Sequence, residues 1–292
     1  MSDIKAFVDK WTRVTVSLCR LFYRKSASMH VYDYTYNPKT RDWANGKVYD
    51  KIISCNRDAY LEYVKCCSGF MEYFQAISPA KQSGNDTDPF WINGWLPPFD
   101  AIVLYSLIAV KKPTIYMEIG SGNSTKFVRR AVSDHKLGTR IISIDPYPRA
   151  EIDNICDKVL RIPVENVPVE TFSELNEGDV LFIDNSHRSF PNSDVTIFFM
   201  EILPNLKPGV IYGLHDIFLP NDYPEVFAKR YYNEQYLLAA YLLGGGGGSN
   251  ILFPVAYMSY RDEVKKALLG ENIKPPWGDE PLHGGAFFMV KA

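Results

Sequence analysis

The sequence predicts a doubly wound α/β protein, and three observations support this prediction. From residue 91 onward, short apolar runs typical of strands alternate with longer segments of helical period. Four of these runs end at or next to an acidic residue, namely Glu118, Asp145, Asp184 and Asp216. A hydrophobic content of 46% over 292 residues is ample for a core. The alternation implies a parallel sheet that is buried on both faces.

Residues 1–90 are helical in pattern but interrupted, and we expect a mainly helical N-terminal extension that serves as a substrate lid or a dimer contact. Apolar residues at helical spacing near its start indicate a docking helix rather than a membrane-surface helix: Ile4, Phe7, Val8 and Trp11. The stretch 29–51 is rich in Tyr, Asn, Gly and Pro and predicts a loop or small hairpin. Residues 60–77 resume the helical period. A linker-like loop then sets a boundary near residue 90, and 91–292 form the second domain.

The remaining elements follow from periodicity and turn signals. Helices are expected at 99–112, 124–135, 193–206 and 223–243, with a helical turn at 171–175. Strands are expected at 114–119, 140–145, 157–163, 179–184, 209–216, 251–260 and 285–291, which makes a seven-stranded sheet. The last two strands have little helix between them, which favours a hairpin-like closing pair. The glycine run 244–248 is expected to cap the preceding helix at Gly244 and then to form a flexible connection.

Composition narrows the classes of partner and compartment. The formal net charge of -2 gives no indication of a nucleic-acid binder. No secretory signal is visible, and the most apolar segment, 101–110, is too short to span a bilayer, so a cytoplasmic protein is expected. The five cysteines form no CxxC and no metal spacing with histidine, and we expect buried thiols in a reducing compartment. Self-association into a homo-oligomer is left open.

The loop "EIGSGNST", residues 118–125, predicts a nucleotide-type cofactor site after the first strand. A dinucleotide fingerprint needs a third glycine for close packing of helix and strand, and Thr125 stands at that position. The carboxylate of Glu118 also disfavours a phosphate nearby. S-adenosylmethionine (SAM) carries no phosphate, and its ammonium and sulfonium groups suit an acidic strand end. A tight turn that binds no ligand is the simplest alternative.

Other groups near this loop fit the remaining parts of SAM. The side chains of Ser121, Asn123 and Ser124 and the start of the following helix can donate hydrogen bonds to its carboxylate. Asp145 ends the second strand, where an acidic side chain accepts hydrogen bonds from both ribose hydroxyls. NAD would use the same residue, so Asp145 supports a nucleoside cofactor without choosing between the two.

The fourth and fifth strands bring further chemistry to the same edge of the sheet. Asp184 and His187 follow the fourth strand, and His215 and Asp216 follow the fifth. Two carboxylates on neighbouring strand ends can hold Mg²⁺, which would lower the pKa of a bound hydroxyl. Alternatively, one of the histidines acts directly as a general base. The simplest alternative is that the aspartates cap helices and the histidines are structural.

Four stretches in this order, "EIGSGNST", "ISIDPYPR", "LFIDNSHRSF" and "HDIFLPNDYP", resemble class I SAM-dependent methyltransferases. The resemblance covers about residues 91–292. It is closest to a bacterial branch that includes macrocin-type sugar O-methyltransferases and cephalosporin-hydroxylase-like proteins. It implies the Rossmann-like seven-stranded sheet of that class. The motifs are specific for the superfamily and not for the methyl acceptor.

The resemblance also implies roles for individual residues. The methionine end of SAM would be held by Glu118, Gly120, Ser121 and Gly122. Asp145 would bind the ribose, and Glu165 would lie near the adenine. In metal-dependent relatives, the positions of Asp184 and Asp216 are metal ligands, together with an acidic residue where this chain has His215. This departure leaves open a Mg²⁺ site, a site for a softer ion, or a metal-free site with histidine as base.

The expected activity is methyl transfer from SAM to an oxygen of a small molecule, such as a sugar or a natural-product intermediate. Aromatic side chains near 90–99 and 231–241 can supply walls for an acceptor, although core or dimer contacts are the simpler role for them. One alternative is an NAD(P)-dependent oxidoreductase, against which Thr125 and the closing strand pair speak. Another is a non-catalytic SAM-binding scaffold, which recruits a partner through residues 1–90.

Overall fold

The computed structural model describes residues 38–41, 47–84, 86–270 and 273–292. Every helix and strand named below belongs to the compact unit formed by residues 39–292. The expected amphipathic helix with Ile4, Phe7, Val8 and Trp11 lies outside the described residues.

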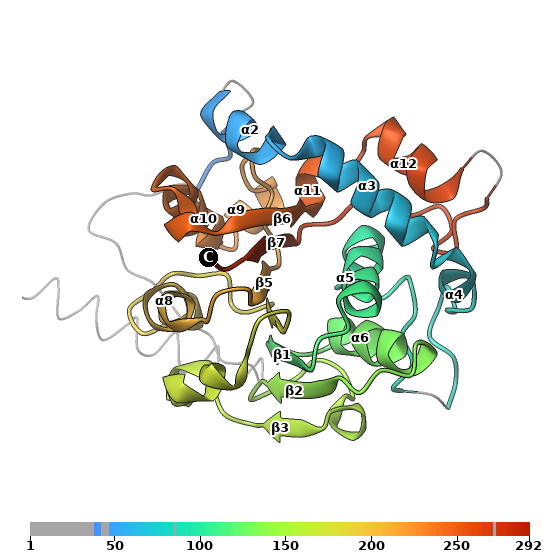
Figure 1. Ribbon diagram of the computed structural model, residues 1–292, viewed down its shortest axis with the longest axis horizontal. Helices are drawn as coiled ribbons and strands as arrows, with labels where there is room; N and C mark the ends of the chain where they lie inside the picture. The colour runs from blue at the N-terminus through green and yellow to red at the C-terminus, as the bar shows by residue number, and fades with distance from the viewer. Residues whose placement is uncertain (1–37, 42–46, 85, 271–272) are drawn as a thin grey trace, which may run out of the picture. The chain divides into compact units, whose positions relative to one another are not determined.

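Seven strands form one sheet in the order β3-β2-β1-β4-β5-β7-β6, in which β7 runs antiparallel to both of its neighbours (Figure 1). The strands are β1 (Ile115–Ile119), β2 (Arg140–Ile144), β3 (Lys158–Leu160), β4 (Val180–Ile183), β5 (Ile211–Leu214), β6 (Asn250–Pro254) and β7 (Phe287–Val290). β1, β4 and β5 are buried along their whole length, as strands covered on both faces must be. This order confirms the expected class of sheet.

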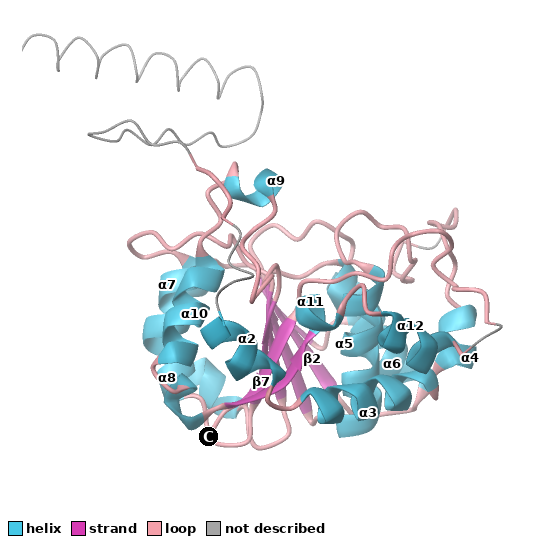
Figure 2. Cartoon of the chain, turned by 90° about the horizontal axis from the view of Figure 1, so that it is seen from above, coloured by secondary structure: helices cyan, strands magenta, loops and turns pink. Residues whose placement is uncertain are grey.

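Helices cover both faces of the sheet (Figure 2). On one face lie α5 (Pro98–Lys111), α6 (Asn123–Asp134), α3 (Arg57–Ser68) and α12 (Asp262–Leu269), beside α4 (Met71–Gln75). The other face carries α7 (Asp194–Ile197), α8 (Leu203–Asn205) and α10 (Glu234–Leu243), and the π-helical stretch Phe198–Ile202 joins α7 to α8. The remaining helices are α2 (Lys47–Ser54), α9 (Glu225–Ala228) and α11 (Val255–Met258), with 3₁₀ turns at Asp153–Ile155, Val164–Asn166, Val169–Glu174 and Gly246–Gly248.

The described part of the N-terminal region is helical, as expected. Helix α3 buries Tyr60, Val64 and Cys67 and packs against α5 and α12. The salt bridge from Arg57 to Glu263 links α3 to α12 across 206 positions of sequence. Helix α2 begins at Lys47, inside the stretch that was expected to be a loop or hairpin. The division of the chain near residue 90 stays a prediction.

The two closing strands are adjacent, as expected, but they are not a simple hairpin. Helices α11 and α12 lie between β6 and β7 in the chain, and β6 ends at Pro254 instead of continuing to residue 260. Strand β7 inserts between β5 and β6. Phe288 of β7 pairs with Gly213 of β5, and a Cβ at Gly213 would lie 2.5 Å from the Phe288 ring. Glycine at position 213 therefore lets the antiparallel strand approach the parallel part of the sheet.

The helix expected over 223–243 is broken in two. Helix α9 ends at Ala228 and α10 begins at Glu234, with Tyr231 between them in the left-handed region at φ 60°. The backbone N–H of Asn233 donates to the carbonyl of His187 at 2.9 Å. A contact with a residue 46 positions earlier therefore replaces helical hydrogen bonding at the break, which periodicity alone does not reveal.

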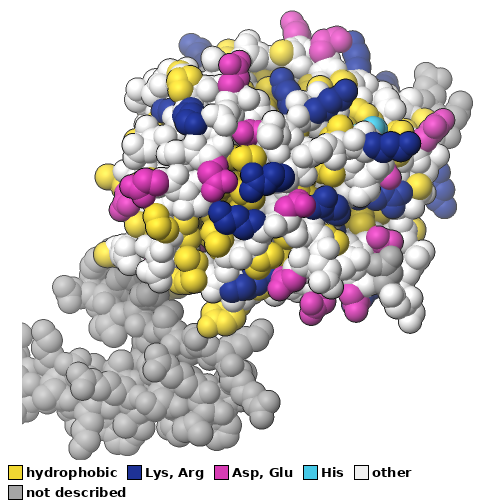
Figure 3. Space-filling model, turned by 60° about the horizontal axis from the view of Figure 1, so that its bottom comes forward, with side chains coloured by type: hydrophobic (Ala, Val, Ile, Leu, Met, Phe, Trp, Pro, Cys, Tyr) yellow, Lys and Arg dark blue, Asp and Glu magenta, His cyan; other side chains and the backbone are white. Residues whose placement is uncertain are grey.

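Two further expectations concern the burial of the cysteines and the absence of a membrane-spanning helix. Cys67 is buried, but Cys55 and Cys66 are exposed, so the expectation that all thiols are buried is wrong for these two. Acidic and basic side chains both occur on the face drawn in Figure 3, beside hydrophobic ones. None of the helices in the described ranges has the length and apolar character needed to cross a bilayer.

Candidate active site

The carboxyl ends of β1, β2, β4 and β5 border two adjoining cavities. The first cavity, of about 300 Å³, is lined by Gly120, Ser121, Gly122, Asn123, Asp145, Glu165, Asp184, Asn185, Ser186 and Asp194, among others. The second, of about 430 Å³, is lined by Trp91, Trp95, His187, His215, Asp216, Phe227, Arg230, Tyr232 and their neighbours. Trp95, Arg149 and Asp184 line both. A ligand in either cavity therefore reaches Asp184.

Glycine is required at position 120 because the ends of β1 and β4 come close together there. The φ of Gly120 is +80°, and a Cβ at this position would lie 1.8 Å from the carbonyl oxygen of Asp184. The loop after β1 thus touches the backbone after β4. At Gly122 the situation is opposite, because a Cβ built there would have no atom within 4 Å. Gly122 borders the open first cavity. The two glycines of the motif therefore serve different purposes.

Glu118 lies under the loop rather than in the cavity wall. It is fully buried, and its Oε2 accepts a hydrogen bond from the hydroxyl of Thr125. The same hydroxyl accepts the N–H of Gly122 at 3.1 Å. Burial raises the pKa of Glu118 to about 7. Thr125, where a dinucleotide site would have glycine, therefore ties the loop to the strand end.

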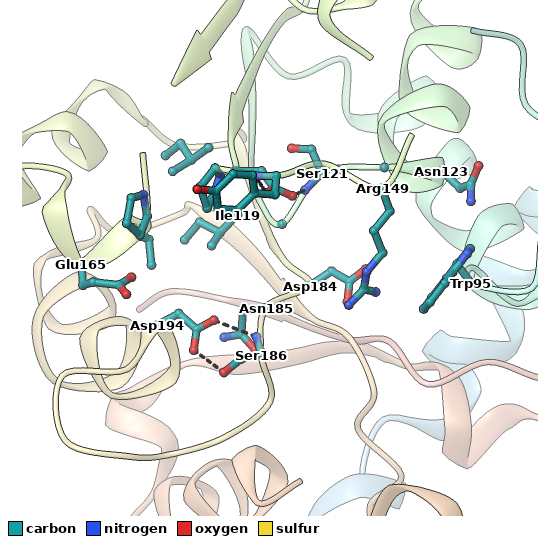
Figure 4. A pocket seen from close by; sticks show the side chains of 18 residues that line it. Trp95, Ile119, Ser121, Asn123, Arg149, Glu165, Asp184, Asn185, Ser186 and Asp194 are labelled. Carbon is teal, nitrogen blue, oxygen red and sulfur yellow. Dashed lines mark hydrogen bonds between the residues drawn. The ribbon is translucent and has the colours of Figure 1, made fainter. Parts of the chain in front are cut away.

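The other expected cofactor residues are divided between the wall and the layer beneath it. Asp145 lines the first cavity and accepts the N–H of Ser121 at 2.9 Å and of Tyr147 at 2.7 Å. Glu165, in a 3₁₀ turn after β3, borders the cavity at the side away from Asp184 (Figure 4). Ser124 is buried and, like Glu118, does not line it. A carboxylate accepts about four hydrogen bonds, so Asp145 keeps capacity for a ligand.

Asp184, His187, His215 and Asp216 lie together at the floor of the second cavity. Nε2 of His187 is 3.3 Å from Asp184 Oδ1 and 3.4 Å from Asp216 Oδ2. Nδ1 of His215 is 3.5 Å from Asp184 Oδ1 and 3.6 Å from Asp216 Oδ1. Each imidazole thus faces both carboxylates. The structure brings together all four residues expected at the ends of the fourth and fifth strands.

Two buried carboxylates hold the opposite nitrogen of each ring. Glu234 Oε2 lies 2.9 Å from His187 Nδ1, and Asp100 Oδ2 lies 3.2 Å from His215 Nε2. Asp100 also accepts the N–H groups of Gly285 and Ala286, which fixes its orientation. With one nitrogen bound in this way, each ring directs its other nitrogen toward Asp184 and Asp216.

The electrostatics of this cluster favour protonated imidazoles. Burial alone lowers the pKa of His187, but its hydrogen bonds to Asp184 and Glu234 raise it to about 10. Burial likewise opposes the charge on His215, and the carboxylates of Asp184 and Asp216 hold its pKa well above the usual value. The pKa of Asp184 is held well below its usual range by the two imidazoles, against the effect of burial, whereas burial raises the pKa of Asp216.

The backbone at two of these residues is unusual. His187 and Asp216 have φ values of +58° and +54°, in the left-handed region that side chains other than glycine rarely adopt. Such conformations persist where surrounding contacts over-determine them, and they are concentrated at functional sites. For His187 those contacts include its carbonyl, which accepts the N–H groups of Asn233 and Glu234.

The arrangement of the cluster gives no support to a metal ion. In the part of the chain that the structure describes, no group of three or more His, Cys, Asp or Glu side chains is placed to hold one. The oxygens of Asp184 and Asp216 already face imidazole nitrogens, whose raised pKa values favour protons there. The expectation that Asp184 and Asp216 are metal ligands stays a prediction.

Sequence reasoning missed several residues of the site. The sequence could have indicated Asp100, because it is an acidic residue at the start of the most apolar helix. In the structure its side chain is fully buried, where a carboxylate needs partners. Nothing in the sequence indicated Glu234, because an acidic residue in the first turn of a helix is common. Trp95 lay in an aromatic segment proposed as an acceptor wall, but nothing distinguished Arg149.

Comparison with known proteins adds one finding on the family and two on similar structures. Residues 117–217 match the profile of a family described as "Methyltransferase domain". An SAH-bound methyltransferase of Podospora anserina, PaMTH1, is 14% identical, with 91% of this chain and 99% of that chain covered and a TM-score of 0.41. An O-methyltransferase of Bacillus cereus in complex with SAH is also 14% identical, with coverages of 84% and 99% and a TM-score of 0.40. No curated protein sequence matches this chain.

The matched segment runs from β1 to just beyond β5 and contains the glycine loop, Asp145, Asp184 and Asp216. The strand order with an antiparallel β7 is typical of the class I fold. Residues 117–217 thus match a methyltransferase domain, and they lie within a sheet of the class I methyltransferase type.

Proposed function

We propose that the protein transfers the methyl group of SAM to an oxygen of a small acceptor at the junction of the two cavities. The observation that carries this proposal is that Asp184 lines both cavities, at the carboxyl edge of the sheet. Methyl transfer from a sulfonium needs the acceptor oxygen to be aligned behind the methyl carbon, and little else. Two adjoining cavities with one shared wall supply such an alignment.

The first cavity takes the cofactor. Asp145 binds the ribose hydroxyls, Glu165 lies near the adenine, and Gly120, Ser121, Gly122 and Asn123 border the methionine end. Glu118 and Ser124 act from below, Glu118 by holding the loop through Thr125. SAM supplies the electrophilic methyl group, and every other task falls to residues of the chain.

The second cavity takes the acceptor. Asp184 contacts the acceptor hydroxyl at the junction, and Asp216 orients the imidazoles beside it. His187 or His215 accepts the hydroxyl proton in the fraction of molecules in which that ring is neutral. Because the carboxylates raise both pKa values, that fraction grows with pH.

The acceptor class is a sugar or a natural-product intermediate, in line with the O-methyltransferase branch that the sequence motifs resemble. The cavity suits a small molecule, since about 430 Å³ lies within the usual range for such sites. Trp91, Trp95, Phe227 and Tyr232 supply aromatic walls, which suit flat rings and sugar faces alike.

A thermal-shift panel with SAM, SAH, NAD⁺ and NADP⁺, with and without Mg²⁺, tests the proposal. Stabilisation by SAM and SAH alone is expected, since ligands that bind the native state raise the melting temperature. Stabilisation by NAD⁺ without any by SAH would overturn it in favour of an oxidoreductase. SAH binding by a protein that transfers no methyl group to any phenol, catechol or sugar tested would favour the non-catalytic scaffold.

A further inference from the structure

We propose that the second cavity binds an acceptor that carries an anionic group, a carboxylate or a phosphate, held at the cavity mouth by Arg149 and Arg230. This inference rests on the proposed methyl transfer, because it assigns the class of acceptor to that same site. Its evidence is separate from the evidence for the cofactor, however. It lies in the distribution of charged and aromatic side chains around the second cavity.

Arg149 is an exposed side chain at the junction of the two cavities. Its guanidinium lies over the Trp95 ring, 4.4 Å from the centroid, and Trp95 is itself 56% exposed. Figure 4 shows Arg149, Trp95 and Asp184 on the same side of the first cavity. Stacking holds the guanidinium plane in place, and no acceptor among the described residues engages its N–H donors.

Arg230 also lines the second cavity and has a similar arrangement. Its guanidinium lies 5.8 Å from the centroid of the Phe227 ring, and both residues line the cavity. Within the described ranges, no carboxylate is within ion-pair distance of Arg149 or Arg230. The other arginine nearby, Arg188, is engaged differently, since its Nε donates to the Arg230 carbonyl at 2.7 Å. Two stacked guanidinium groups without a carboxylate partner therefore face one cavity.

The cavity is polarised from floor to mouth. Asp184 and Asp216 line the buried end together with His187 and His215, and Glu234 and Asp100 lie behind the two rings. Four carboxylates thus surround two imidazoles there, which disfavours a further anion at this end. Glu280 and His283 also line the cavity. An acceptor with a hydroxyl at one end and an anion at the other therefore fits in one direction only. The hydroxyl meets the His–Asp cluster, and the anion meets the arginines.

Matched ligand pairs test the inference on the full-length protein, with and without saturating SAH. Isothermal titration calorimetry at low ionic strength compares 4-hydroxybenzoate with neutral 4-hydroxybenzamide, and 4-hydroxyphenyl phosphate with neutral hydroquinone. The anion of at least one pair is expected to bind about tenfold more tightly than its neutral partner, the effect of one charge-assisted hydrogen bond. The pair that shows the preference tells a carboxylate site from a phosphate site.

Two variants and one control assign the preference to residues. Arg149→Gln and Arg230→Gln are each expected to reduce the preference to about threefold or less. Arg261→Gln is the matched control, because Arg261 also stacks on an aromatic ring, Tyr257, at 4.4 Å but lines neither cavity. It should keep the full preference, and near-wild-type melting temperatures would show that all three variants fold.

Several results would overturn the inference. Equal binding of anion and neutral partner in both pairs would do so, as would no measurable binding of either anion. A loss of preference in Arg261→Gln equal to that in the other two would also count against it. If Arg149→Gln weakens SAH binding and leaves anion binding unchanged, Arg149 belongs to the cofactor cavity and the two-arginine site is wrong. Absence of SAH binding would overturn the methyltransferase proposal instead, because the anion titrations without SAH are read independently.

Discussion

The carboxylate of Glu234 lies 2.9 Å from Nδ1 of His187, although 47 positions separate the two residues in sequence. The pair joins the start of α10 to the loop after β4, and it directs the other ring nitrogen toward Asp184 and Asp216. Both side chains are nearly or fully buried, so each depends on the other for compensation of its charge.

Replacement of this carboxylate is expected to shift the titration of the ring. Glu234→Gln keeps the size of the side chain and one hydrogen bond but removes a charge that raises the pKa of His187. The pKa of His187 should fall, and the stability of the protein should drop by about 1–3 kcal/mol. Histidine NMR titration with urea unfolding measures both. Tyr236→Phe, on the exposed side of the same helix, is the control. An unchanged His187 titration would contradict this account of the pair.

Stability should fall with pH in the alkaline range because of His187. Its folded pKa of about 10 is above the ordinary value of 6.5, so the folded state holds a proton that the unfolded state loses between these values. The contribution is complete below about pH 6.5 and disappears as pH rises toward 10, at up to about 1.4 kcal/mol per pH unit. Chemical denaturation at several pH values should show a steeper decline for the wild type than for His187→Gln. Parallel curves would exclude the raised pKa.

The two glycines of the cofactor loop should respond differently to the same substitution. Gly120→Ala places a methyl group against the Asp184 carbonyl at a residue with positive φ, and a loss of about 3–5 kcal/mol or failure to fold is expected. Gly122→Ala should leave stability within about 1 kcal/mol, because its Cβ meets no atom, but should weaken SAH binding. Unfolding curves and calorimetry check both. Equal effects on stability would contradict the proposed difference.

Turnover should depend on Asp184 far more than cofactor binding does. Asp184→Asn removes the carboxylate at the junction of the cavities and is expected to lower methyl transfer about 10²–10⁴-fold. SAH affinity should change by less than about tenfold, since the proposed ribose and methionine contacts remain. Asp262→Asn, in the first turn of α12 and away from both cavities, is the control. Unchanged turnover in Asp184→Asn would remove this residue from the catalytic group.

The sequence by itself determined the class of sheet and the residues at its strand ends. Alternating apolar runs and helical periods place Asp145, Asp184 and Asp216 at one edge, because the ends of parallel strands converge whatever the details of packing. The glycine loop was recognisable in the same way, since its residues are contiguous and directly follow a predicted strand. These features depend on residues close in sequence.

Only the tertiary structure decided what surrounds those residues. Asp100 and Glu234 reach the two histidines from helices α5 and α10. Arg149 comes from a loop, and Arg230 from the break in a segment whose period predicted one helix. Contacts over such separations depend on how the helices pack against the sheet. Thr125 shows the difference most clearly. In sequence it marks the absence of a glycine, whereas in the folded protein its hydroxyl joins the buried Glu118 to the loop that borders the first cavity.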